Sequence, residues 1–246
     1  MSSGERVDQD LNWTIDEDRE RFRSYLIPGT SVLRNRFDVD DPGELRLLEG
    51  IATAIRTHRL ADDHTLAGPA TLDYPHLRRV HGYLFQDVYD WAGEERTCHG
   101  LRKGDKPFAD LHEIPTYLSS AHRVLVSDDF RSSDAEAFAT AGAEAFVLVN
   151  QAHPFREGNG RSTRALLELA ADHQNPYHKL YFTRWDDKLE WNQASHDSRP
   201  PRGTALVDAV PMQEIFRTIT AERRCATQHR HIDIDADQGI DYGNDL

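Results

Sequence analysis

Residues 153–164 combine more reactive side chains than any other part of the chain, in the order HPFREGNGRSTR. His153 is the side chain here that accepts a proton near neutral pH most readily. Glu157 offers a carboxylate, and Mg²⁺ bound to phosphates usually takes only one or two carboxylates from a protein. Arg161 and Arg164 are three residues apart, so on a helix both can reach one polyphosphate.

The glycines of this segment suit an anion. Gly158 and Gly160 precede an apolar, helix-forming run over residues 165–171. A glycine-rich turn that enters a helix presents free backbone N–H groups and the positive end of the helix dipole. The residue types therefore predict that a nucleotide polyphosphate, a divalent cation and a base meet at a helix N-terminus.

Helical periodicity predicts the elements that position this segment. Apolar residues recur at helical spacing over 138–149 and stop just before His153, so the segment is a loop between two apolar helices. Residues 96–110 lose this period and contain glycines and a proline, which favours a short hairpin. The same periodicity predicts further helices over residues 44–58, 72–91, 111–126, 192–196 and 210–223.

Segment 153–164 matches the motif H-x-F-x-[D/E]-G-N-G-R-x-x-R of the Fic family at every fixed position. Residues 25–35 (YLIPGTSVLRN) and 81–93 (HGYLFQDVYDWAG) also resemble that family, and 101–108 (LRKGDKPF) resembles its flap hairpin. The resemblance extends over about residues 20–220. It implies a mostly α-helical Fic fold: a helical bundle with a small β-hairpin flap beside the active-site loop.

The same resemblance implies a protein adenylyltransferase, which transfers AMP from ATP to a Tyr, Thr or Ser hydroxyl of a target protein. It implies that His153 is the catalytic base and that Glu157 holds Mg²⁺. Asn159 would fix the loop, and Phe155 is expected in the core because an aromatic ring would pin the loop to the bundle. The implied ATP-binding residues are Gly158, Asn159, Gly160, Arg161 and Arg164.

The flap candidate consists of Leu101, Arg102, Lys103 and Gly104. An extended edge can align a segment of the target protein by backbone pairing, and the resemblance supports this use. The plain alternative is a charged hairpin exposed to water.

Two other functions fit the same motif. One is a protein phosphotransferase of the Doc type, although that relative lacks the second arginine, which is Arg164 here. The other is a nucleotide-binding scaffold without activity, although the intact His153 and Glu157 argue against it. The sequence names neither the target protein nor the oligomeric state.

Weaker metal-site candidates lie elsewhere. His196-Asp197 is a lone HD pair, and metal-dependent phosphohydrolases need further ligands. Cys225, His229 and His231 are possible metal ligands, but they border an acidic tail and are more simply solvated. The sequence contains no GxxxxGK[ST], GxGxxG or HExxH motif, so it lacks the commoner nucleotide-binding and zinc-protease motifs.

Many Fic proteins carry a brake, [S/T]-x-x-x-E-[G/N], whose Glu pairs with the second arginine of the motif. Here Glu49-Gly50 and Glu157-Gly158 end correctly, but Leu45 and His153 stand where Ser or Thr is needed. The resemblance therefore implies a toxin that is restrained by a separate small antitoxin, which supplies the inhibitory Glu to Arg164. A constitutively active enzyme is the alternative.

Length and composition are consistent with this interpretation. The chain has 246 residues and a formal net charge of −13, which argues against nucleic acid as a partner. With two cysteines, no long apolar run and no signal-like start, it is expected in the cytoplasm and not in a membrane. We expect a flexible N-terminus (1–19), a Fic domain (20–224) and an acidic, disordered tail (225–246).

Overall fold

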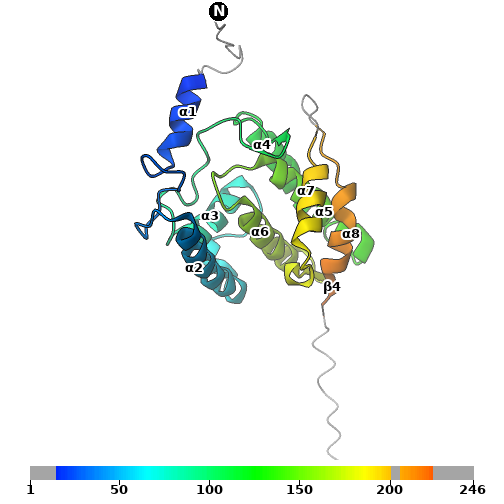
Figure 1. The fold of residues 1–246 in the computed structure, drawn as a ribbon. Coiled ribbons are helices and arrows are strands. Elements are labelled where there is room, and N and C mark those ends of the chain that lie inside the picture. The colour runs from blue at the N-terminus through cyan, green and yellow to red at the C-terminus, as the bar shows by residue number, and fades with distance from the viewer. Residues whose placement is uncertain (1–14, 201–205, 224–246) are drawn as a thin grey trace, which may run out of the picture.

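The computed structural model describes residues 15–200 and 206–223. Over these residues the chain is mostly helical, as predicted (Figure 1). The α-helices are α1 (Ile15–Ser24), α2 (Pro42–Asp62), α3 (Tyr74–Phe85), α4 (Ile114–Leu125), α5 (Ala135–Ala152), α6 (Asn159–Gln174), α7 (Lys188–Asp197) and α8 (Val210–Ile219). The remaining elements are the 3-10 turns η1 (His64–Ala67) and η2 (Phe182–Arg184) and the strands β1 (Arg102–Lys103), β2 (Lys106–Pro107), β3 (His178–Leu180) and β4 (Thr220–Glu222).

Both ends of the chain extend past these ranges. Residues 15–19, which the sequence grouped with a flexible start, lie in α1. Residues 1–14 and the tail from 224 onward, with Cys225, His229 and His231, lie outside the described residues.

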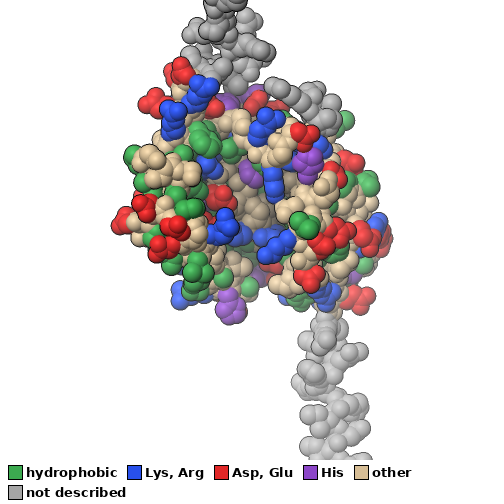
Figure 2. Space-filling view, in the orientation of Figure 1, with side chains coloured by type: hydrophobic (Ala, Val, Ile, Leu, Met, Phe, Trp, Pro, Cys, Tyr) green, Lys and Arg blue, Asp and Glu red, His purple; other side chains and the backbone are tan. Residues whose placement is uncertain are grey.

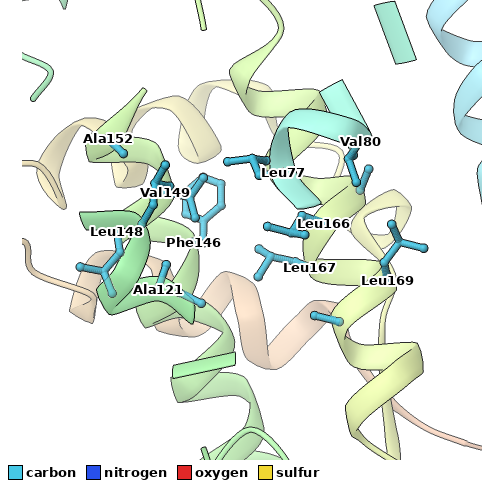
Figure 3. Packing of buried hydrophobic residues seen from close by; sticks show 14 of the residues in the cluster. Leu77, Val80, Ala121, Phe146, Leu148, Val149, Ala152, Leu166, Leu167 and Leu169 are labelled. Carbon is cyan, nitrogen blue, oxygen red and sulfur yellow. The ribbon is translucent and has the colours of Figure 1, made fainter. Parts of the chain in front are cut away.

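α5 lies at the centre of the core because apolar side chains surround it on every side. It packs against α4, α6 and α8. Figure 3 shows Phe146 and Val149 of α5 facing Leu166 of α6 and Leu77 of α3. Since the two helices that flank residues 153–158 are both anchored in this core, the loop between them has a rigid frame.

Aspartates fix where four of the helices begin. Each accepts a hydrogen bond from a backbone N–H of the first turn, which satisfies a donor that has no partner within the helix. The caps are Asp41 for α2, Asp73 for α3, Asp134 for α5 and Asp187 for α7.

α3 and α8 each end several residues earlier than predicted. α3 ends at Phe85 and not at residue 91, because the N–H groups of Val88, Ala92 and Glu94 bond three residues back in successive tight turns. These turns still bury Val88 and Trp91. α8 ends at Ile219 because residues 220–222 pair as β4 with β3, antiparallel. The sequence did not predict this second sheet. The hairpin predicted within 96–110 is confirmed as β1 and β2, with Arg102 opposite Pro107.

Within the described ranges, no helix is both long enough and apolar enough to cross a bilayer.

Candidate functional site

The loop between α5 and α6 is closed by a left-handed residue at each end. His153 ends α5 with φ 43°, and Gly158 precedes α6 with φ 83°. The Asn159 side chain closes the loop: its oxygen accepts from the Phe155 N–H at 2.9 Å, and its amide donates to the Phe155 carbonyl at 2.8 Å. Phe155 is fully buried, which confirms that it belongs to the core.

His81 of α3 supports the loop from beneath. Its ring stacks on Phe155 at 3.8 Å between centroids. Nδ1 accepts the Gly93 N–H at 2.8 Å, so Nε2 carries the hydrogen and donates to the Glu157 carbonyl at 3.0 Å. Burial lowers the pKa of His81 to about 4, which keeps this tautomer neutral. Sequence reasoning missed this role, since it depends on contacts 76 residues apart.

His153 lies under the flap segment. Its imidazole stacks on Phe108 with 3.5 Å between ring centroids, and its carbonyl accepts a hydrogen bond from Arg96 at 2.9 Å. Burial, followed by the charge of Arg96, lowers the pKa of His153 to about 3. The ring is therefore neutral at physiological pH, as a proton acceptor must be.

His153 faces a cavity of about 520 Å³, which Gly160 and Arg164 of α6 also line. Trp191 and Asn192 of α7 form part of the opposite wall. Figure 2 shows that this face of the molecule is hollowed near its middle, with Lys and Arg side chains around the hollow. A volume of this size is typical of a small-molecule site, and the cations favour an anionic ligand.

The two motif arginines point to different surroundings. Arg164 lines the cavity, lies 5.8 Å from the Trp191 ring centroid, and has no hydrogen bond or ion pair with any described residue. Arg161 instead pairs with Glu49 of α2, donates to the Thr53 hydroxyl at 3.2 Å, and stacks on Phe85. The helical spacing predicted one shared anion site, but only Arg164 lines the cavity in this state.

Glu49 therefore has a role that the sequence did not predict. One oxygen pairs with Arg161 and the other accepts a hydrogen bond from the Tyr89 hydroxyl. Glu49, one of the two glutamates that match the end of the brake motif, is thus bound to the first arginine of the active-site motif and not to the second.

Glu157 lies at the rim of the loop, with 44% of its side chain exposed. One oxygen accepts the Gly158 N–H at 3.0 Å and is 3.7 Å from the Arg161 guanidinium. Among the described residues, no group of three or more His, Cys, Asp or Glu side chains could hold a metal by itself. A single accessible carboxylate fits a cation that arrives with the phosphates.

The flap is fastened to the C-terminal end of α7. Lys103 donates to Asn192 at 2.7 Å, and His196 bonds Asp105 at 2.8 Å. Arg199 donates to the Lys103 and Lys106 carbonyls and stacks on Phe108.

The other predicted flap residues surround the same turn. The Leu101 carbonyl accepts the Phe108 N–H, Arg102 is exposed, and Gly104 makes the turn with φ 68°. His196 of the HD pair thus serves to hold the flap, with no metal-ligand cluster around it in the described residues.

A wider groove of about 980 Å³ lies along α4 and α5, but no residue of 153–164 lines it. The candidate chemistry therefore belongs to the smaller cavity.

Together, the fold and the loop define a helical protein whose glycine-containing turn presents a neutral histidine to a cavity lined in part by cations. Residues 71–171 match the Fic/DOC family. The chain is 35% identical over 144 residues to "Probable protein adenylyltransferase y4lH" of Sinorhizobium fredii (strain NBRC 101917 / NGR234), covering 58% of this chain and 71% of that protein. The chain belongs to the Fic/DOC family.

Other similarities cover more of the chain. It is 29% identical over 201 residues to "Probable protein adenylyltransferase Fic" of Escherichia coli (strain K12), covering 80% of this chain and 92% of that protein. The crystal structure of the BepC protein of Bartonella tribocorum with bound AMPPNP is similar in fold, with a TM-score of 0.70 at 23% identity over 82% of this chain and 98% of that one.

Proposed function

We propose that the chain is a protein adenylyltransferase, which transfers AMP from ATP to a Tyr, Thr or Ser hydroxyl of a target protein. The observation that carries this proposal is that neutral His153, the first turn of α6 and the Arg164 guanidinium, which has no partner among the described residues, border one cavity. The relatives in Sinorhizobium fredii and Escherichia coli, which bear the name of this activity, support it.

The proposed reaction follows from what these groups can do. The target hydroxyl oxygen attacks the α-phosphorus of ATP, and the bond from that phosphorus to the bridging oxygen of pyrophosphate breaks. His153 takes the hydroxyl proton. Backbone N–H groups of Gly158 to Gly160 and Arg164 hold the β- and γ-phosphates, so that pyrophosphate leaves in line, and Arg161 would join them only on leaving Glu49.

Glu157 is the proposed carboxylate for Mg²⁺, which would offset charge on the phosphate oxygens. Its accessible side chain at the loop rim supports this assignment. The flap residues 101–104 are proposed to align the target by backbone pairing.

Labelled ATP separates this proposal from its alternatives. Label should reach a target protein from α-labelled ATP and not from γ-labelled ATP. Transfer from the γ position would indicate a phosphotransferase of the Doc type, and no transfer would indicate a binding scaffold. Arg164 favours AMP transfer over the phosphotransferase, because that relative lacks this arginine.

The base is tested by His153→Ala, with His58→Ala as the control, since His58 lies on the exposed side of α2. Loss of a general base typically costs about 10²–10⁴-fold in rate. We expect that loss for His153→Ala with ATP binding retained, and an unchanged rate for His58→Ala. Transfer at the wild-type rate by His153→Ala would contradict the assignment.

We also propose that the enzyme is a cytoplasmic toxin restrained by a small antitoxin. A Glu from such a partner would pair with Arg164, whose side chain forms no close ion pair with a described residue, and would keep it from ATP. Expressed alone, the chain should slow bacterial growth, and His153→Ala should relieve the effect. A harmless wild-type protein that purifies from its native operon without a small helical protein would refute this part.

A further inference from the structure

Arg96 lies between the flap segment and the active-site loop and is almost completely buried, at 2% exposure. Its guanidinium donates to the carbonyls of His153, at 2.9 Å, of Cys98, at 2.7 Å, and of Ala109. Its backbone N–H donates to the Pro154 carbonyl at 2.8 Å. No carboxylate among the described residues forms an ion pair with it, so its direct hydrogen-bond partners are carbonyl oxygens, while the charges of Asp110, Glu95 and Asp18 act from farther away.

The three carbonyls belong to parts that must stay in register for catalysis. Cys98 and Ala109 lie on either side of the hairpin, and the Ala109 N–H in turn donates to the Gln151 carbonyl at 2.9 Å. His153 is a left-handed residue without being glycine, a conformation that persists only where its surroundings enforce it. The planar, rigid guanidinium of an arginine is suited to holding these carbonyls in place, because it can donate to several acceptors at once.

We propose that Arg96 is a positioning residue: its guanidinium, which bonds the His153 carbonyl and the carbonyls on both sides of the hairpin, fixes the turn that aims the His153 imidazole into the cavity. This inference rests on the proposed function insofar as His153 is the base. It adds a residue outside the motif to the machinery that prepares that base.

Arg96 is not the sole charge near the imidazole. After burial, Arg96 is the largest cause of the low pKa of His153, ahead of Arg199 and Lys103, while the backbone of Asn150 opposes it. Other charged or titratable side chains that line the same cavity are Arg164 of α6, Asp186, Asp187, and Lys188 and His196 of α7.

Three variants of the full chain separate orientation from charge. Arg96→Lys keeps the charge but loses the planar guanidinium, and Arg96→Gln loses both. Arg79→Gln is the matched control, because Arg79 also donates to two carbonyls and a hydroxyl, but between α3 and residues 67–71. Each variant is measured for kcat and KM of AMP transfer across pH and for the His153 titration by NMR, with His153→Asn used to assign the signal.

We expect Arg96→Gln to lose about 100-fold in kcat, because a small misplacement of a reacting group has that cost. Its KM for ATP should stay near the wild-type value, and the acid limb of its pH profile and the His153 titration should both move to higher pH. Arg96→Lys should lose kcat while the acid limb stays in place. Arg79→Gln should change neither quantity.

The inference is overturned if His153 titrates in Arg96→Gln as it does in the wild-type chain, or if Arg96→Lys keeps the wild-type kcat. If Arg96→Gln does not fold, Arg96→Lys decides; failure of both to fold, with Arg79→Gln folded, would reduce Arg96 to a purely structural residue. A wild-type chain that transfers no AMP would refute the proposed function, whereas the NMR titration would still test Arg96.

Discussion

Gly158 and Gly160 are two residues apart in the motif, but only Gly160 has room for a side chain. Gly158 has φ 83°, and a Cβ atom there would overlap the Phe85 ring, with Cε1 at 2.9 Å and Cζ nearer still. Phe85 is fully buried and contacts His81 and Arg161 through its ring, so the ring cannot move aside to make room for the new Cβ atom. A Cβ atom at Gly160, in the first turn of α6, would have no heavy atom within 4 Å.

We therefore expect Gly158→Ala to destabilise the chain by about 3 kcal/mol, from about 1 kcal/mol for the left-handed backbone and about 2 kcal/mol for overpacking. In a protein of this size that lowers Tm by roughly 10 °C. Gly160→Ala should leave Tm unchanged or raise it slightly, since Ala is the better helix former. Thermal melts of the two variants measure both effects.

A second-site change tests the stated cause. Phe85→Leu removes the ring atoms that the new Cβ would meet, so the double variant should lose less stability than the sum of the two single changes. Strict additivity, or an equal loss of stability for the two glycine variants, would refute the argument from the Phe85 contact.

The remaining predictions concern charge. Glu49→Gln should destabilise the fold by about 2 kcal/mol in urea unfolding, because it removes the nearer of the two carboxylates that pair with the Arg161 guanidinium; an unchanged midpoint would contradict that. Burial raises the pKa of Glu168 from 4.5 to about 7, so the folded state retains a proton that the unfolded state loses between these values. Stability should therefore fall as pH rises through that window, and Glu168→Gln should flatten the fall; melts at pH 5 and pH 8 compare the two. Finally, ADP at saturation should raise the pKa of His153 by about one unit or more in NMR titrations, because an anion favours the imidazolium form; no change would place the phosphates elsewhere.

Much of the frame around the site could be predicted from local sequence. Apolar residues recur at helical spacing on both sides of residues 153–164, and this pattern indicates buried helices before and after the loop. The glycines at 100 and 104 indicated the hairpin. The short strands β3 and β4 were not predicted, because they pair across about 40 residues and no hairpin turn joins them to mark the pairing in the sequence.

The supporting residues of the site were also beyond sequence reasoning. His81 and Arg96 act on carbonyl oxygens of the loop, and a carbonyl is common to every residue, so no side-chain pattern marks the partner. The direction of Arg161 was missed for a related reason. Helical spacing places it one turn from Arg164, but the pairing with Glu49 depends on how α2 packs beside α6.

The low pKa of His153 is unusual for a base, because proton transfer is most effective when the pKa of the base lies near the working pH. The charges of the site account for part of this depression. Apart from burial, the depression comes from the cations Arg96, Arg199 and Lys103. The same cavity holds Arg164, so a triphosphate bound there would offset these charges and make His153 more basic. The proposed base would then be stronger with ATP bound than without it, so proton transfer from an attacking hydroxyl would be favoured where a phosphorus is ready to accept the oxygen.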